Sequence, residues 1–280
     1  MADRFEFTLD VVEALVVGQA TGGDIRQFPL RIGTVPADPV RFVHVATQVY
    51  RGMEERRLSV QGELHPAVRT AFGLLAEPRV AVAVTGVDGL GSDLSVLALT
   101  DGRQALGITQ DPRSDELTFS LFPDEDLVEV ITGVLPAARA ATTPAQTVHR
   151  EAPQEVSAMT ARRRAEAAED KDETDAFGSL RIVKTRSGRA RARQGEQPGG
   201  DVLQQVLAAP RLGGGHILTT GRGRFGELRT GDPMSWLDTE DGRYLVHTTT
   251  GHSGELSANY VPAGRAGVAR AVQQAISAVY

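Results

Sequence analysis

Apolar side chains recur at helical spacing in several stretches of the chain. The two clearest stripes consist of Phe42, Ala46, Val49 and Met53 in residues 39–57, and of Val268, Val272, Ile276 and Val279 near the C-terminus. This spacing predicts an amphipathic helix in each stretch. Shorter helices are expected at residues 8–19, with Thr8 as the N-cap, and at residues 64–76, 123–135, 155–168 and 201–209.

Strand patterns fall between these predicted helices. Residues 80–85 form a short run of valine and alanine, and residues 94–100 are apolar at both alternating sets of positions. The second pattern predicts a strand that is covered on both faces of its sheet. Asp101–Gly102 predicts a two-residue hairpin turn into a strand at 104–109, because both residue types tolerate positive φ. Further strands are expected at residues 4–7, 25–32 and 117–121.

Three phrases of sequence occur twice, in the same order. The pairs are "LLAEPRV" (74–80) with "VLAAPRL" (206–212), "SVLALTDGR" (95–103) with "SWLDTEDGR" (235–243), and "SDELTFSLFP" (114–123) with "SGELSANYVP" (253–262). The offsets are 132, 140 and 139 residues, which places a slip of about eight residues near "TTGRGRFGELRTGDPM". Common order and spacing predict a structural duplication, in which Asp241–Gly242 repeats the hairpin turn of Asp101–Gly102.

The duplication defines the expected organisation of the chain. We predict a single domain of residues 1–280, with an N-terminal half at 1–136 and a C-terminal half at 201–280. Residues 137–200 are charged, rich in alanine and poor in aromatic residues. They are expected to form a partly helical, flexible connection.

Composition and charge argue against several classes of protein. The chain has no cysteine, so it forms no disulfide and no thiolate nucleophile or metal ligand, which suits a cytoplasmic protein. Its net charge of −6 argues against a nucleic-acid binder. No apolar run approaches the roughly 18 residues of a membrane helix, and the N-terminus "MADRFEFTLD" lacks the pattern of a secretory signal.

The search for catalytic motifs finds no active site. The glycine-rich "GVDGLGSD" and "RLGGGHILTT" lead into strands, whereas phosphate-binding loops need a helix behind the glycines. The histidines lack ligand spacing, so we predict no metal, no cofactor and no enzymatic activity. The strongest enzyme hypothesis is a dispersed site of His216 and His247, approaching each other across a sheet, with Asp238. What stands out instead is Leu90 at the tip of a glycine-rich loop, which is typical of a surface that holds another protein.

Two longer segments resemble the EspG family of cytosolic chaperones, which serve type VII (ESX) secretion in actinobacteria. They are "LDTEDGRYLVHTT" followed by "ELSANYVPAGRAGVARAVQQAIS", and "YRGMEERRLSVQGELHPAVRTAFGLLAEPRVAV". The resemblance implies an α+β fold: a quasi-two-fold single domain whose central, mostly antiparallel sheet is flanked by helical bundles. It also implies a chaperone that masks the apolar helical tip of PE/PPE-like heterodimers and delivers them to the secretion machinery.

The family's binding loop lies between its second and third strands and corresponds here to residues 86–93. The resemblance therefore implies a partner-binding site at Val87, Asp88, Gly89, Leu90 and Gly91, with Val87 and Leu90 as anchors.

Other occupants and functions stay open at this point. The resemblance leads us to expect a PE/PPE-like or a WXG-type secretion substrate as the partner. The free chain is expected to be a monomer or weak homodimer, with no nucleic acid bound and no membrane insertion. One alternative function is a structural or regulatory homodimer that uses the same apolar surfaces. A less favoured alternative is the enzyme with the dispersed site.

Overall fold

The computed structural model describes residues 4–33, 39–111, 113, 114, 116–150, 210–223, 225–250 and 256–280. Within these ranges the chain builds one large sheet of eleven strands, all of whose strand pairs are antiparallel. The strand order is β1 (Phe5–Asp10), β7 (Glu116–Pro123), β6 (Gln104–Gln110), β5 (Asp93–Thr100), β4 (Val80–Val87), β9 (Gly213–Arg222), β11 (Met234–Thr239), β12 (Gly242–Thr250), β13 (Leu256–Pro262) and β8 (Gln146–Arg150). The short β10 (Leu228–Thr230) also pairs with β9, and β2 (Ser59–Val60) with β3 (Glu63–Leu64) forms a separate hairpin.

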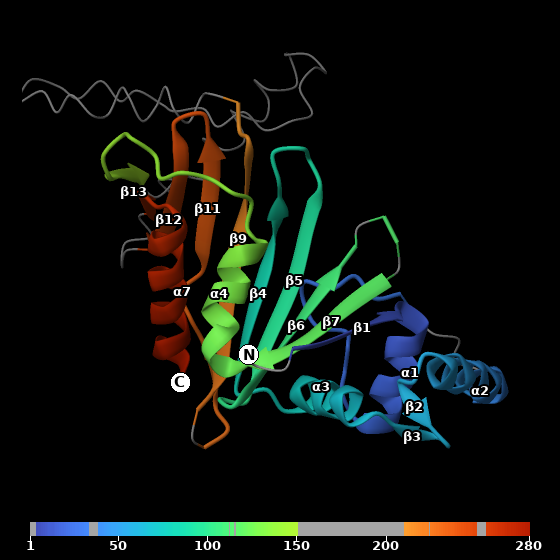
Figure 1. The fold of residues 1–280 in the computed structure, drawn as a ribbon. Coiled ribbons are helices and arrows are strands. Elements are labelled where there is room, and N and C mark those ends of the chain that lie inside the picture. Colours follow the sequence, from blue (N-terminus) through green and yellow to red (C-terminus); the bar gives the residue numbers. More distant parts are fainter. Residues whose placement is uncertain are drawn as a thin grey trace, which may run out of the picture.

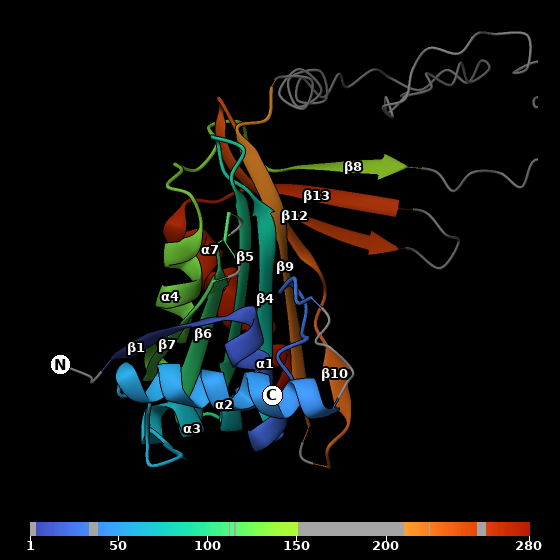
Figure 2. The same cartoon turned by 90° about the vertical axis from the view of Figure 1, so that its right-hand side faces the viewer.

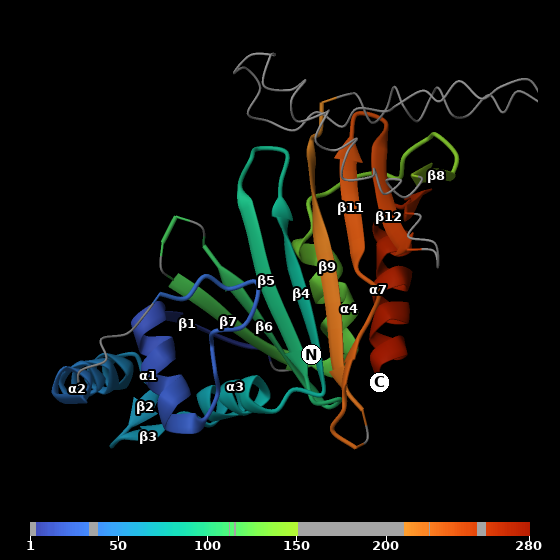
Figure 3. The ribbon, with the colours of Figure 1, turned by 180° about the vertical axis from the view of Figure 1, so that it is seen from behind.

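Helices cover both faces of the large sheet. On one face lie α1 (Val11–Thr21), α2 (Pro39–Glu55) and α3 (Pro66–Ala76), packed against the N-terminal strands. On the other face α4 (Leu127–Val134), which follows a 3₁₀ turn at Asp124–Asp126, lies beside α7 (Arg265–Val279). Figure 1 shows this second pair in front of the sheet, and Figure 3 shows the first group from behind. The predicted α+β class is confirmed.

Two hydrophobic cores lie on opposite faces and share β5. Leu97 and Leu99 of this strand pack into the core under α1–α3, whereas Val96 and Ala98 pack into the core under α4 and α7. Successive side chains of a strand point to opposite faces, so an apolar run fits a strand that is covered twice. The prediction made for residues 94–100 is therefore confirmed.

The amphipathic helices are also confirmed. Helix α2 buries Val49 and Met53, with Phe42 and Ala46 partly buried beside them. Helix α7 buries its whole predicted stripe. The helices predicted at residues 155–168 and 201–209 lie outside the described residues.

Two predictions near the N-terminus are wrong. Asp10, not Thr8, caps α1: its carboxylate accepts a hydrogen bond from the Glu13 N–H, and the Glu13 carboxylate accepts one from the Asp10 N–H. Thr8 stays in β1 because that strand pairs with β7 as far as Asp10. Residues 25–32 form no strand; Ile25 and Leu30 are buried, but they contribute to the core from an irregular segment.

Both hairpin turns exist, with different residues from those predicted. Between β5 and β6 the last paired residues are Thr100 and Ala105, so the loop is longer than two residues and only Gly102 has positive φ. Between β11 and β12, Thr239 pairs with Gly242, so the two-residue loop is Glu240–Asp241 and Gly242 begins β12.

The strand order runs alike on the two sides of the β4–β9 pair. Outward from β4 come β5, β6 and β7, and outward from β9 come β11, β12 and β13. A helix follows the last strand of each series, namely α4 and α7. This order supports the predicted duplication; the quasi-two-fold relation and the division into residues 1–136, 137–200 and 201–280 stay predictions. Within the expected connection, residues 146–150 form β8, which extends the sheet beside β13 (Figure 2).

A buried ion pair fixes the chain that leaves α4. Arg243 and Asp238 are joined by two hydrogen bonds of 2.6 and 2.7 Å, with side chains 3% and 9% exposed. Arg243 also donates from Nη2 to the Pro136 carbonyl at 2.7 Å, and its backbone bonds to Arg139 and Ala141. The pair thus holds residues 136–141 against β12 and satisfies a cation that would be costly to bury alone.

Asp241 holds the next part of the same segment. Its carboxylate accepts hydrogen bonds from the Thr142 hydroxyl, from the Thr143 N–H at 3.1 Å and from the Tyr244 hydroxyl at 2.5 Å. The Thr142 and Tyr244 hydroxyls hold the pKa of the Asp241 carboxyl well below its usual range.

Removing one partner of the buried pair is expected to destabilise the fold strongly. Asp238→Ala should lower the free energy of unfolding by about 3–5 kcal/mol, because Arg243 would remain buried without its counter-charge. Urea denaturation measures this difference. Asp232→Ala, at an exposed position, is the matched control and should change little. The double variant Asp238→Leu/Arg243→Met should recover much of the loss, and an equal loss in both variants would contradict a charge-burial cause.

Stability should depend on pH through Asp241. The folded-state pKa of the Asp241 carboxyl lies below the unfolded value of about 3.9. The ionised carboxylate therefore stabilises the fold fully above the unfolded pKa, and this contribution is lost as the pH falls from there through the lower folded-state pKa. Asp241→Asn should therefore be less stable than the wild type at pH 7, and the gap should narrow between pH 5 and pH 2. Urea denaturation across this pH range measures the difference in free energy of unfolding between the two chains. A difference that does not change with pH would refute the prediction.

Candidate functional site

The predicted binding residues lie together at the tip of the β4–β5 hairpin (Figure 1). Val87 is the last residue of β4, and Asp88, Gly89, Leu90 and Gly91 begin the loop that leads to β5. Leu90 is 92% exposed and Val87 is 42% exposed. The loop therefore presents one leucine almost entirely to solvent, with a partly covered valine beside it.

Hydrogen bonds within the loop fix the position of Leu90. The Asp88 carboxylate accepts bonds from the N–H groups of Leu90 and Ser92, both at 2.8 Å. The Gly91 N–H donates to the Asp88 carbonyl, and the Asp88 N–H donates to the Ser92 carbonyl, both at 3.0 Å. Gly91 has φ of +78°, a conformation that glycine adopts without steric cost. The loop is a preformed turn that holds its apolar residue outward.

A row of glycines under a tryptophan supports the base of this hairpin. Gly86 of β4 pairs with Gly215 of β9, which pairs with Trp236 of β11. A Cβ at Gly86 would lie 2.8 Å from the Trp236 ring, and one at Gly215 would lie 2.3 Å from it. The buried indole thus lies directly over the backbones of two strands. Its Nε1 has no hydrogen-bond partner among the described residues, so packing alone places the ring.

Leu212 adds to the apolar surface, and the sequence did not single it out. Its side chain is 45% exposed, and a Cβ at Gly89 would lie 2.9 Å from the Leu212 carbonyl oxygen. Its N–H donates to the Asp238 carbonyl at 2.9 Å, which fixes this residue just before β9. Leu212 meets the β4–β5 loop only because β4 pairs with β9, and no local sequence pattern reveals that pairing.

The dispersed enzyme site does not assemble. His216 is paired with Ser235 across β9 and β11, and its Nδ1 lies 2.8 Å from the Ser235 hydroxyl. His247 is paired with Met234, the residue next to Ser235. Neighbouring residues of a strand face opposite ways, so the two histidines lie on opposite faces of the sheet and the expected approach is wrong. Asp238 is held by Arg243.

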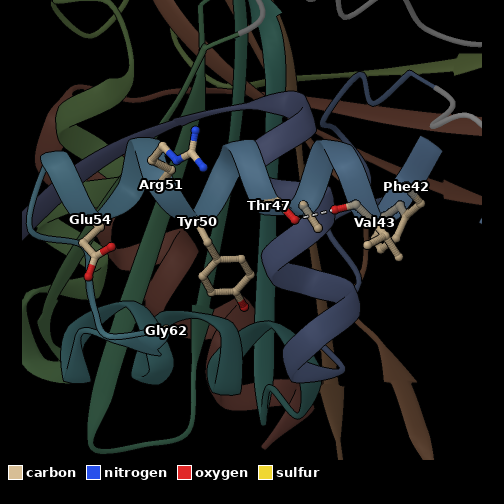
Figure 4. Close-up of a pocket in the computed structure, with 8 residues that line it drawn as sticks. Phe42, Val43, Thr47, Tyr50, Arg51, Glu54 and Gly62 are labelled. Carbon is tan, nitrogen blue, oxygen red and sulfur yellow. Dashed lines mark hydrogen bonds between the residues drawn. The ribbon is translucent and has the colours of Figure 1, made fainter. Parts of the chain in front are cut away.

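A shallow groove of about 490 Å³ lies along α2 (Figure 4). Helix α2 lies away from the tip of the β4–β5 hairpin (Figure 1). The groove is lined by Phe42, Val43, Ala46, Thr47, Tyr50, Arg51, Glu54 and Gly62. None of the three residues of the dispersed site lines it. Within the described ranges, no group of three histidine, aspartate or glutamate side chains is placed to hold a metal ion. No helix in the same ranges is long and apolar enough to cross a membrane.

An antiparallel sheet with helices on both faces and an exposed leucine at a hairpin tip define an α+β protein with a prominent apolar tip. The sequence matches the profile of the EspG family over residues 10–274. The chain therefore belongs to the EspG family, which confirms the predicted resemblance.

A solved structure has the same fold. It is that of the Mycobacterium tuberculosis type VII secretion system chaperone EspG5 in complex with the PE25–PPE41 dimer. It aligns with 97% of this chain and 95% of its own chain, at a TM-score of 0.58 and 12% sequence identity. No curated protein matches this chain significantly by sequence.

The glycine row should be intolerant of even one added methyl group. Gly215→Ala would place a Cβ against the Trp236 ring and 2.2 Å from the Thr85 carbonyl oxygen. Overpacking of this kind costs about 1–3 kcal/mol or more. Gly73→Ala is the matched control: it lies in α3 with open space around it, so it should stabilise by up to about 1 kcal/mol. Thermal or urea unfolding of both variants tests this prediction: Gly215→Ala should lower the free energy of unfolding and Gly73→Ala should raise it. A change in the same direction in both variants would contradict it.

Proposed function

We propose that this protein is a chaperone that binds helical type VII secretion substrates of the PE/PPE kind and masks an apolar tip of the substrate. Membership of the EspG family supports this proposal. So does the shared fold with EspG5, whose structure contains a PE25–PPE41 dimer. The proposed binding residues are Val87, Asp88, Gly89, Leu90 and Gly91, and Leu212 joins them as an added apolar neighbour.

The observation that carries the site is the exposure of Leu90 on a preformed turn. A folded protein gains nothing in its own stability from a leucine that is 92% exposed. A bound partner that covers such a side chain removes its apolar area from water, which is worth about 1.5–3 kcal/mol. Because the turn is already held by Asp88 and Gly91, little further ordering is needed on binding. The loop is therefore suited to act as an anchor.

The energetics fit a partner that must later be released. Two or three apolar anchors contribute several kcal/mol before the cost of association is subtracted. The rest of the affinity must come from a surface of ordinary size, about 1,600 Å² in total, with a polar rim. Substrate masking therefore needs no catalytic group, and we propose binding rather than catalysis as the activity.

The proposal also covers location and free state. A chaperone must meet its substrate before export, so we propose that the protein acts in the cytoplasm. Without a substrate, the protein is proposed to be a monomer or a weak homodimer, because a strong dimer through the β4–β5 tip would block the surface that the substrate needs. A homodimer that uses this tip permanently is the competing function, and it would leave no surface for a substrate.

Leu90→Glu is expected to weaken substrate binding strongly. The added carboxylate would have to be buried at the interface without a counter-charge, so affinity should fall at least tenfold. The test is co-expression of the tagged chain with PE/PPE-like and WXG-type proteins encoded beside it, followed by purification and titration of the complex. Val60→Glu on β2 and Val43→Glu in the α2 groove are matched controls, because both replace exposed valines. Both controls should bind like the wild type.

The possible outcomes distinguish a wrong binding site from a wrong function. Binding by the wild type that survives in Leu90→Glu but not in Val43→Glu would move the site to the α2 groove. No substrate complex with any chain, together with a stable dimer in sedimentation velocity, would replace the chaperone proposal by the homodimer.

A further inference from the structure

A second hairpin repeats the turn of the β4–β5 loop at the opposite end of the sheet. It joins β9 to β10, and Figures 1 and 2 show it at the end of β9 far from the β4–β5 tip. The Gly226 N–H donates to the Gly223 carbonyl at 2.9 Å, and the Gly223 N–H donates to the Glu227 carbonyl at 2.9 Å. Gly226 has φ of +83°. These are the same two backbone bonds and the same positive-φ glycine as at Asp88, Gly91 and Ser92.

The apolar residue occupies the same place in both turns. Phe225 precedes Gly226 as Leu90 precedes Gly91, and each is 92% exposed. Each also donates its N–H to a carboxylate of its own turn: Leu90 to Asp88 at 2.8 Å and Phe225 to Glu227 at 3.1 Å. Leu228, directly opposite Arg222 in the β9–β10 pair, is 73% exposed. The hairpin therefore presents two apolar side chains on a turn that is held rigidly from within.

Charge distinguishes the two tips. Residues 86–93 contain two aspartates and no arginine or lysine, whereas residues 221–230 contain three arginines and one glutamate. That glutamate, Glu227, is bonded to Arg229 at 2.6 Å. Arg222 is exposed and forms no ion pair with a described residue. Residues 86–93 have a net charge of −2, with Asp93 paired to Arg31 at 2.9 Å, and residues 221–230 have a net charge of +2. A surface that complements one tip is therefore mismatched to the other.

We infer that the β9–β10 hairpin, through Phe225, Leu228 and Arg222, is a second docking site for a protein partner that presents an apolar pocket rimmed by carboxylates. This partner differs from the substrate proposed for the Leu90 tip, and both can bind at once because the tips lie at opposite ends of the sheet. A protein fits better than an anionic membrane, since the chain's net charge of −6 opposes approach to anionic lipid. An aromatic residue beside an arginine on a rigid turn is also the composition of an interface hot spot. The inference uses the proposed function only to name the occupant of the other tip.

Photo-crosslinking in cells of the native host tests the inference. Benzoylphenylalanine replaces Phe225 in one chain, Leu90 in a second and Val60 in a third, which serves as an exposed control. We expect a discrete adduct from position 225 that differs in mass from the substrate adduct at position 90 and is absent at position 60. Arg222→Glu should remove the adduct at 225 and leave that at 90.

The protein identified in the adduct is then purified and titrated. Its dissociation constant should rise at least tenfold with Phe225→Ala and with Arg222→Glu, and the affinity should weaken as salt is raised. Val60→Glu should bind like the wild type. Because Phe225 is exposed, Phe225→Ala should unfold at the same urea concentration as the wild type, which excludes misfolding as the cause.

Several results would overturn the inference. One is an identical adduct at positions 225 and 90. Another is the absence of an adduct at 225 while position 90 captures substrate. A third is a captured partner that binds Arg222→Glu as tightly as the wild type. Binding to phosphatidylglycerol vesicles that is lost with Phe225→Ala would assign the hairpin to membranes instead. If position 90 captures no secretion substrate while position 225 still gives its adduct, the proposed function would be refuted and the second docking site would still be supported.

Discussion

The pairing of β4 with β9 is the contact on which the rest of the structure depends. Eight residue pairs, from Val80–Gly221 to Val87–Gly214, join strands that are far apart in sequence. Without this pairing the sheet would divide into two smaller sheets, each with a long exposed edge. The Gly86–Gly215 pair lets Trp236 lie directly on the backbone, so a large apolar ring seals the junction from the face of α4 and α7.

Both hairpin tips follow from this pairing. Strands β4 and β9 run antiparallel, so the loop after β4 and the hairpin after β9 must leave the sheet at opposite ends. Leu90 and Phe225 therefore lie beyond opposite ends of one hydrogen-bonded strand pair. Tips that are already held by their own hydrogen bonds lose little conformational freedom on binding. A small number of exposed apolar side chains can then serve as anchors within a larger interface.

Local features of this fold were predictable, and contacts between distant segments were not. Residues 39–57 and the C-terminal stripe form helices because their own spacing gives each one apolar face. Thr8 failed as a cap because β7 holds β1 in strand as far as Asp10, and Ile25 and Leu30 are buried without a partner strand. The positions of His216 and His247 on opposite faces depend on strand register, which a change of one residue would reverse. Leu90 was found because glycines flank it in sequence, whereas Leu212 joins it only through the β4–β9 pairing.

Exposed apolar tips favour nonspecific association, and the structure limits this tendency in three ways. Each tip presents only two or three large apolar side chains, fewer than a patch of several hundred Å² that promotes association would need. Carboxylates of the same turns, Asp88 and Glu227, lie beside the apolar residues, and the chain as a whole carries a net charge of −6, which favours solubility. The turns are closed by their own hydrogen bonds and leave few backbone groups free to pair with another strand. Apolar surface can thus remain available for a specific partner while nonspecific association stays weak.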